Sequence, residues 1–151
     1  MEKSRLKKFT PGLGEVEFKM ASTRLEFHDA FALIFREYTS RGYILPQHYP
    51  NGLRITLFNL HPGTRIFIAK KNRKVVATCT LIPDSLLGLP LDMGYKEEGN
   101  SLRAQQRKLC EGAYLAIDRK LFDLRIFSLF NINKLGFLLS LFKIVLQYAV
   151  H

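Results

Sequence analysis

The first regular pattern along the chain is an alternation of apolar and polar residues over positions 15–19, which predicts a half-buried strand. From residue 27 the period becomes helical, and a set of large apolar side chains falls on one face: Phe27, Phe31, Ile34, Phe35 and Tyr38. Thr23 followed by Glu26 forms a capping box before that run, and Gly42 follows it. The pattern therefore predicts a helix that begins after Thr23 and ends before Gly42.

The middle of the chain carries the strongest strand signal. Residues 65–70 and 74–82 are rich in β-branched and apolar side chains, and a polar turn at 71–73 separates them, which predicts an antiparallel hairpin. The preceding segment, 43–63, contains three prolines and an Asn-Gly pair. That composition predicts a long connection with at most a short strand near 54–58. Residues 1–14, with their charges, proline and glycines, predict an arm that leads into the domain.

The remainder of the chain predicts three elements. After a loop that contains Pro83 and Gly88-Leu89-Pro90, Asn100 is expected to cap a short helix over 102–108. Residues 109–117 predict a buried strand. The stretch 121–150 is rich in Leu, Phe and Ile, but charged residues interrupt it, so it predicts a buried or membrane-surface helix and not a spanning one.

Composition narrows the class of protein. A chain of 151 residues is long enough for one domain with a core, and the 47% hydrophobic and 24% charged residues are typical of a globular protein. The formal net charge of +10 would attract nucleic acid, anionic lipid or an acidic protein, and a solvated basic surface without a dedicated partner is the alternative. The basic N-terminus lacks an apolar signal core, so a cytoplasmic location is expected.

The residue pattern itself resembles one enzyme family. The segments that carry the resemblance are Phe67-Ile68-Ala69, Val76-Ala77-Thr78-Cys79-Thr80-Leu81, Asp84-Ser85, Gly88-Leu89-Pro90, Asp92, Leu102-Arg103, Arg107 and Cys110-Glu111-Gly112-Ala113, leading into Leu115-Ala116-Ile117-Asp118. Together with the order of the predicted elements, they resemble the long-chain N-acyl amino acid synthases, which have the GNAT acyltransferase fold. The resemblance implies an α/β (α+β) fold, with a mixed, mostly antiparallel sheet flanked by helices, in a single domain over residues 15–151.

The resemblance also implies an activity. Enzymes of this family move a long-chain fatty acyl group from acyl carrier protein, or from acyl-CoA, to the α-amino group of an amino acid such as tyrosine. The acyl-phosphopantetheine group would be a co-substrate, and no permanently bound cofactor is expected. The basic charge agrees with an acidic acyl carrier protein as partner. Nucleic acid is not expected, because no recognised motif accompanies the charge.

Glu111 is the candidate general base, because it is a lone carboxylate in an apolar strand and burial would raise its pKa. The alternative is a structural carboxylate paired with Arg103, Arg107 or Lys108. Asp84 and Asp92 are weaker candidates and are expected to be turn residues.

The resemblance places an oxyanion-binding backbone amide within residues 112–115. The donor-binding candidates are therefore Gly112, Ala113, Tyr114 and Leu115, with Arg119 and Lys120 holding a phosphate because the segment 118–124 contains no glycine-rich loop. Tyr43 and Tyr49 are candidates for the acceptor pocket, with simple packing as the alternative.

The histidines and cysteines do not indicate a metal site or a nucleophile. The four histidines do not occur at metal-ligand spacings and no metal is expected, while Cys79 and Cys110 are expected to be core thiols. The GNAT fold normally continues with further strands, so either a homodimer supplies the missing pairing or the domain is C-terminally truncated. A catalytically incompetent module that binds acyl carrier protein or a membrane surface is the alternative function.

Overall fold

The computed structural model describes residues 5–10, 14–121 and 130–150. Its centre is a five-stranded sheet with the strand order β1-β2-β3-β4-β5, in which every pairing is antiparallel. The strands are β1 (Arg5–Thr10), β2 (Gly14–Met20), β3 (Arg65–Lys71), β4 (Lys74–Pro83) and β5 (Cys110–Ile117). The helices are α1 (Arg24–Ser40), α2 (Lys96–Ala104) and α3 (Phe130–Ala149). The predicted α/β class is therefore confirmed.

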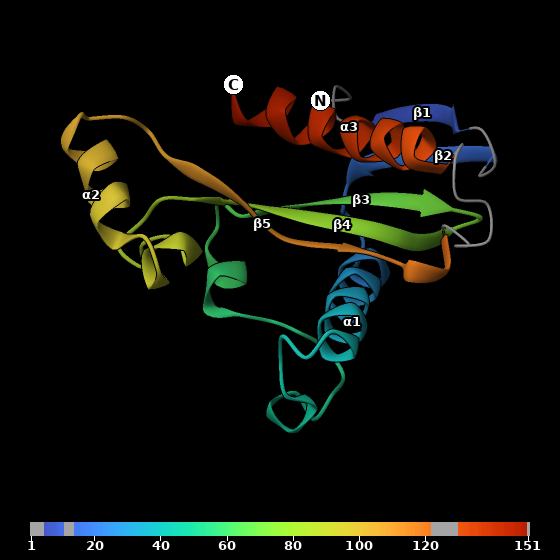
Figure 1. Cartoon of the computed structure of the whole chain (residues 1–151), viewed down its shortest axis with the longest axis horizontal. Helices are drawn as coiled ribbons and strands as arrows, with labels where there is room; N and C mark the ends of the chain where they lie inside the picture. Colours follow the sequence, from blue (N-terminus) through green and yellow to red (C-terminus); the bar gives the residue numbers. More distant parts are fainter. Residues whose placement is uncertain (1–4, 11–13, 122–129, 151) are drawn as a thin grey trace.

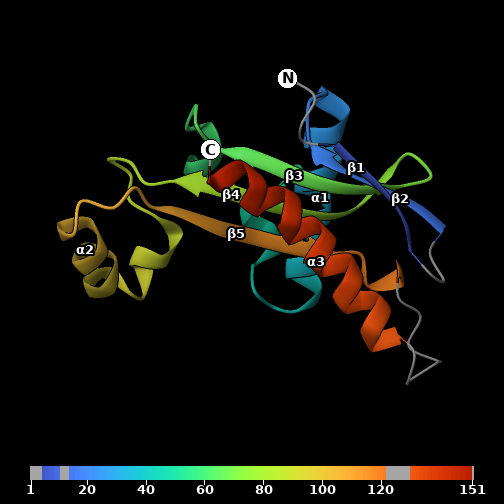
Figure 2. The same ribbon diagram turned by 90° about the horizontal axis from the view of Figure 1, so that it is seen from above.

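Two helices cover opposite faces of the sheet. Figure 1 shows α3 above the sheet and α1 below it, while α2 lies beyond one end of the strands. Seen from above, α3 crosses the sheet obliquely (Figure 2). It contacts β1 to β4, whereas α1 contacts β3, β4 and β5. Among the described strands, β5 is thus covered mainly on the α1 side, and β1 and β2 mainly on the α3 side.

The two faces of the sheet bury separate apolar clusters. On the α3 side, Phe18, Phe67 and Cys79 pack with Phe137 and Leu141, and the rings of Phe18 and Phe137 lie 5.2 Å apart. On the α1 side, a second cluster brings strand residues together with one stripe of α1: Ile66, Ile68, Val75, Leu33 and Ile34. The period-two pattern of the strands and the helical period of α1 are thus both explained by burial.

The local predictions for α1 and the hairpin are confirmed. Thr23 accepts a hydrogen bond from the Glu26 amide, and Glu26 in turn accepts one from the Thr23 amide, which completes the capping box. Between β3 and β4, Asn72 and Arg73 have φ angles of 49° and 66°. Two successive positive φ angles are typical of the tight turns that match the twist of a hairpin.

The arm predicted over residues 1–14 is wrong in part, since Arg5–Thr10 forms β1 and pairs with β2. The pairing aligns Leu6 with Phe18, and Leu6 packs against the cluster below α3. The local sequence is mostly polar and basic, so its period is weak. It becomes a strand because β2 offers an otherwise unpaired edge.

The helix expected over 102–108 is displaced. α2 begins at Lys96, with Glu97 and Glu98 in the first turn, where acidic side chains favour a helix N-terminus. Asn100 therefore lies inside the helix, and its side chain accepts a hydrogen bond from Arg103 at 3.1 Å. In the segment 43–63, the structure has two short 3-10 turns, Pro46–His48 and Leu57–Leu60, and no strand.

The buried strand predicted at 109–117 is a strand at the edge of the described sheet, and it is buried only in part. Ala113 and Ala116 are buried, whereas Cys110, Gly112 and Leu115 are exposed, because β5 has β4 as its neighbour on one side only. α3 buries one face and exposes a stripe that includes Leu135, Leu139 and Leu146. Within the described ranges, no helix is long and apolar enough to cross a membrane.

Candidate active site on the α1 face of β4 and β5

The register of β4 and β5 decides which side chains share a face. Glu111 pairs with Ile82 and Ala113 with Thr80, and residues directly opposite each other in an antiparallel pair point to the same side. Ala77, Cys79 and Leu81 pack in the cluster below α3, so the alternating residues Thr78, Thr80 and Ile82 face α1. Glu111 therefore lies on the α1 face of the sheet.

A β-bulge interrupts β5 three residues after Glu111. The pairs Thr80↔Ala113 and Thr78↔Ala116 leave Tyr114 and Leu115 together opposite Cys79. Tyr114 has a φ of 52°, which is uncommon for a residue with a large side chain. A bulge takes one residue out of the regular ladder, so it frees backbone groups for another partner. This bulge lies inside the stretch 112–115, where the sequence predicted an oxyanion-binding amide.

Glu111 is a half-buried carboxylate. Its Oε2 accepts a hydrogen bond from the Leu91 amide at 2.8 Å. Burial raises the pKa of Glu111 and the nearby charge of Asp92 raises it further, while the bond from Leu91 acts in the opposite direction. No ion pair among the described residues includes Glu111. A carboxylate with a raised pKa is suited to take a proton near neutral pH.

Arg103 does not pair with Glu111, so that structural alternative is wrong for Arg103. Its guanidinium binds Asp84 through Nε at 2.7 Å and Nη2 at 2.8 Å. It also binds both oxygens of Asp92, through Nη1 at 3.0 Å and Nη2 at 2.7 Å. The hydrogen bonds from Arg103 are the main reason why the pKa values of Asp84 and Asp92 are lowered. Both are consequently ionised partners of an arginine and are poorly suited to act as bases.

Asp92 also keeps the turn role that was expected of it, because its Oδ2 accepts a hydrogen bond from the Leu89 amide at 2.7 Å. Two glycines make room for this carboxylate. A Cβ atom added at Gly88 would lie 2.5 Å from Asp92 Oδ2, and one added at Gly99 would lie 2.6 Å from Asp92 Oδ1. The cluster of Arg103, Asp84 and Asp92 therefore joins the end of β4 to α2 beside Glu111.

Arg54, which the sequence analysis did not single out, reaches the same face of the sheet. Its guanidinium carbon lies 4.4 Å from the ring centre of Tyr114 and 5.2 Å from that of Tyr38. Its Nε and Nη1 atoms are buried without a hydrogen-bond partner, as are the hydroxyls of Thr78 and Thr80. Arg54 lies within the irregular connection 43–63, so no local period of the sequence could have indicated its position beside the sheet.

The acceptor-pocket candidates pack against aromatic side chains of α1. Tyr43 packs edge-on against Tyr38, with ring centres 5.6 Å apart, and Tyr49 packs against Phe35 at 6.2 Å. Both tyrosines therefore make the packing contacts that were the alternative interpretation. Tyr43 is 66% exposed, so one side of its ring stays open beside Tyr38. The assignment of both residues to an acceptor pocket remains a prediction.

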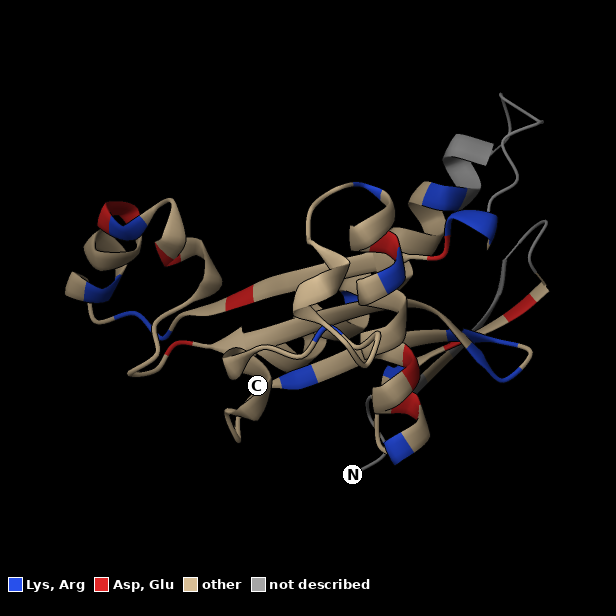
Figure 3. Ribbon diagram, turned by 90° about the horizontal axis from the view of Figure 1, so that it is seen from below, with Lys and Arg blue, Asp and Glu red and all other residues tan. Residues whose placement is uncertain are grey.

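The donor-binding candidates lie along β5 and in the turn after it. Gly112 and Leu115 are exposed, Tyr114 is half-buried and Ala113 is buried. Arg119 and Lys120 are exposed in a short 3-10 turn, Arg119–Leu121, where Asp118 accepts a hydrogen bond from the Lys120 amide at 2.9 Å. Figure 3 shows Lys and Arg on several elements and not in a single stripe. The charge alone therefore does not outline a donor site.

The cysteines differ from each other. Cys79 is buried, and burial raises its pKa to about 11, so it is a thiol at neutral pH. Cys110 is exposed at the start of β5, so its expected place in the core is wrong. His61 accepts a hydrogen bond from the Gly63 amide through Nδ1 at 3.0 Å. In the part of the chain that the structure describes, no group of His, Cys, Asp and Glu side chains is arranged to hold a metal ion.

Comparison with known proteins supports the family suggested by the residue pattern. A solved structure of FeeM, an N-acyl amino acid synthase from uncultured soil microbes, superposes with a TM-score of 0.67 and is 24% identical in sequence. The match covers 89% of this chain and 65% of that one, so this chain spans less than two thirds of the FeeM protein. At this identity the likeness shows the fold, which agrees with the expected GNAT-like architecture.

No curated protein matches the chain. The family model described as "N-acyl amino acid synthase FeeM" matches residues 29–151, which include most of α1, the whole β3–β4–β5 segment and α3. Because that match takes in most of the chain, the protein belongs to the FeeM family of N-acyl amino acid synthases.

Proposed function

We propose that the protein is an N-acyltransferase that moves a long-chain fatty acyl group from a phosphopantetheine thioester to the α-amino group of an amino acid. Membership of the FeeM family supports the reaction class. The observation that carries the assignment to this site is the position of Glu111, which has a raised pKa and lies on the α1 face of β5 three residues before the bulge. A proton acceptor and a free backbone amide would thus lie on the same strand.

The proposed reaction is a direct transfer. The lone pair of the amine attacks the thioester carbonyl carbon, and the carbonyl oxygen becomes an oxyanion that a backbone amide at Tyr114 or Leu115 binds. The carbonyl then re-forms, the C–S bond breaks, and the thiolate leaves. Glu111 takes the proton that the attacking nitrogen loses and returns it to the leaving sulfur. The products are an N-acyl amino acid and a free phosphopantetheine thiol, and no covalent enzyme intermediate is required.

For the donor, we propose acyl carrier protein, with acyl-CoA as the alternative. Arg119 and Lys120 are exposed in the turn that follows β5, which supports a contact with a phosphate group or an acidic surface. The net charge of +10 would attract an acidic carrier protein before the two proteins are in contact, and would so favour its docking. Because acyl carrier protein is the proposed donor, we also propose a cytoplasmic location.

One observation favours the second candidate, a module that binds a carrier protein or a membrane surface without catalysis. α3 exposes Leu135, Leu139 and Leu146 along one stripe, and Lys134 is exposed beside it. A helix with an exposed apolar stripe and lysines suits a membrane interface, and it equally suits a homodimer contact. Neither role requires Glu111, so the two candidate functions can be separated by experiment.

The test is to mix the purified protein with long-chain acyl carrier protein and a pool of amino acids, and to look for N-acyl products by mass spectrometry. Glu111→Gln should lower turnover by roughly 10²- to 10⁴-fold, because it removes the proton acceptor but keeps the side-chain volume. Glu98→Gln, at an exposed position of α2, is the matched control and should leave turnover unchanged. If carrier protein binds but no product forms with the wild-type protein, the second candidate is supported instead.

A further inference from the structure

The guanidinium group of Arg54 is enclosed but lacks a protein partner. It lies against the rings of Tyr38 from α1 and Tyr114 from the β5 bulge, whose centres are 5.2 and 4.4 Å from the guanidinium carbon. This arrangement provides cation–π contacts to the plane of the group. Hydrogen-bond donors, however, lie in that plane and point past the two rings. The rings therefore leave the donors of Arg54 without acceptors.

Two of these donor atoms, Nε and Nη1, are buried and make no hydrogen bond. No ion pair among the described residues includes Arg54. Tyr38 does not neutralise it, because burial raises the pKa of that hydroxyl and outweighs the opposing charge of Arg54. A buried charged donor without an acceptor is destabilising, so a ligand that supplies acceptors to these two atoms would bind favourably.

The missing partner should be an anion with planar, paired oxygens. The guanidinium has two pairs of adjacent donors, Nε with Nη2 and Nη1 with Nη2. Each pair matches the two oxygens of a carboxylate. The unpaired hydroxyls of Thr78 and Thr80 lie on the same side of the sheet and would suit a polar ligand. Tyr38 and Tyr114 provide aromatic surface next to Arg54, and Tyr43 packs against Tyr38.

We propose that Arg54 binds the α-carboxylate of the acceptor amino acid, an inference that rests on the proposed acyl transfer. In an α-amino acid, the carboxylate and the amine are attached to the same carbon, so anchoring one positions the other. Arg54 lies against Tyr114, and Tyr114 belongs to the bulge whose amides would bind the thioester oxyanion. A carboxylate at Arg54 thus sets the amine next to the reacting carbonyl and on the face where Glu111 lies.

The same contact would make the enzyme specific for amino acids over simple amines. An amine without a carboxylate would leave the guanidinium unpaired, and a site built to bind a charged group rejects ligands that lack it. Arg54 is therefore a positioning and specificity residue for the acceptor. It needs no role in proton transfer.

The test compares two product analogues that differ only in the carboxylate: N-acyl tyrosine and N-acyl tyramine with the same acyl chain. Their dissociation constants are measured by isothermal titration calorimetry, so that turnover is not required. The wild-type protein should bind N-acyl tyrosine roughly 10- to 100-fold more tightly than N-acyl tyramine, the range expected for charge-assisted hydrogen bonds. Arg54→Gln should remove this preference and leave the affinity for N-acyl tyramine unchanged.

Arg41→Gln is the matched control, because Arg41 also acts on Tyr38 through its charge but is exposed at the end of α1. It should keep the preference for N-acyl tyrosine. If Arg54→Gln does not fold, as judged by thermal unfolding, Arg54→Met provides the same comparison, since it keeps a long unbranched side chain and loses the charge and the hydrogen-bond donors. The inference is overturned if the wild-type protein binds both analogues equally or binds neither, or if the folded Arg54 variant keeps the preference.

A transfer assay with tyrosine and tyramine as acceptors separates this inference from the proposed function. Equal acylation of the two acceptors would refute the carboxylate site and leave the acyltransferase intact. Carboxylate-dependent binding without any acyl transfer would have the opposite meaning: the carboxylate site would stand, and the proposed function would fail.

Discussion

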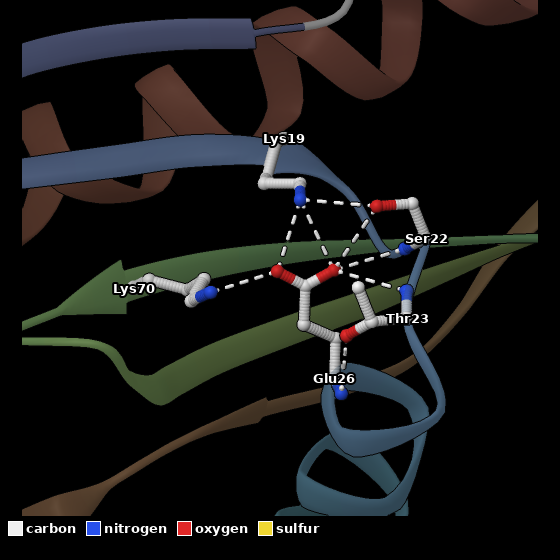
Figure 4. A network of polar contacts seen from close by, with 5 residues as sticks. All are labelled: Lys19, Ser22, Thr23, Glu26 and Lys70. Carbon is white, nitrogen blue, oxygen red and sulfur yellow. Dashed lines mark hydrogen bonds and ion pairs between the residues drawn. The ribbon is translucent and has the colours of Figure 1, made fainter.

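Replacing Glu26 by glutamine tests how one buried carboxylate holds α1 to the sheet. The side chain of Glu26 is 6% exposed and accepts hydrogen bonds from Lys70 at 2.7 Å and from Lys19 at 2.9 and 3.1 Å. The Ser22 and Thr23 amides add bonds at 3.0 and 3.3 Å (Figure 4). One carboxylate therefore joins the start of α1 to both β2 and β3.

The magnitude follows from the pKa of this group. Burial by itself would raise the pKa of Glu26, but the hydrogen bonds from Lys70, the Ser22 amide and Lys19 outweigh it and lower the pKa from 4.5 to about 2. Each pKa unit corresponds to roughly 1.4 kcal/mol, so the ionised carboxylate stabilises the fold by at most about 3 kcal/mol. Because the folded-state pKa is the lower one, this contribution is complete above pH 4.5 and is lost as the pH falls towards 2.

The assay is urea-induced unfolding of the wild-type protein and of Glu26→Gln, repeated over a series of pH values. The free energy of unfolding of the variant should be lower at neutral pH by up to about 3 kcal/mol, and the difference should shrink steadily below pH 4.5. Glu98→Gln, at an exposed site of α2, should differ from the wild type by less than about 0.5 kcal/mol throughout. A Glu26→Gln difference that is equally small, or that does not change between neutral and acidic pH, would refute the reasoning.

Three further predictions concern packing and reactivity. Gly99→Ala should lower the melting temperature despite the better helix propensity of alanine, because its Cβ would lie 2.6 Å from Asp92 Oδ1. Gly94→Ala should leave the melting temperature unchanged, because a Cβ there meets nothing within 4 Å. Equal effects of the two changes would disprove the steric argument. Phe137→Ala should lower the free energy of unfolding in urea by about 3 to 5 kcal/mol, because Phe137 is fully buried against Phe18. A similar loss of stability for Leu139→Ala would contradict this description of α3, because Leu139 is exposed. A thiol reagent at mildly alkaline pH should label the exposed Cys110 and spare Cys79, because burial raises the pKa of Cys79 to about 11. Peptide mass spectrometry detects the labelled residue. Rapid labelling of Cys79 in the folded protein would contradict its buried position.

Features that depend on neighbouring residues were predictable from the sequence. The capping box at Thr23 and Glu26 and the hairpin turn at Asn72 and Arg73 involve contacts a few positions apart, so composition and period determine them. The segment around Glu111 also carries enough of the family pattern to indicate the fold and the family. Membership of the FeeM family and the order of α1, β3, β4 and β5 were therefore determined by the sequence alone.

Only the tertiary structure decided which charges meet. Arg103 was one of the partners considered in the alternative interpretation of Glu111, but it binds Asp84 and Asp92, because the path of the loop between β4 and α2 brings all three together. Arg54 lies against the rings of Tyr38 and Tyr114, which come from separate elements, and no period in the connection around it signals that position. β1 becomes a strand through pairing with β2 and not through its own pattern. These outcomes depend on contacts between distant segments, which form only when the helices pack on the two faces of the sheet.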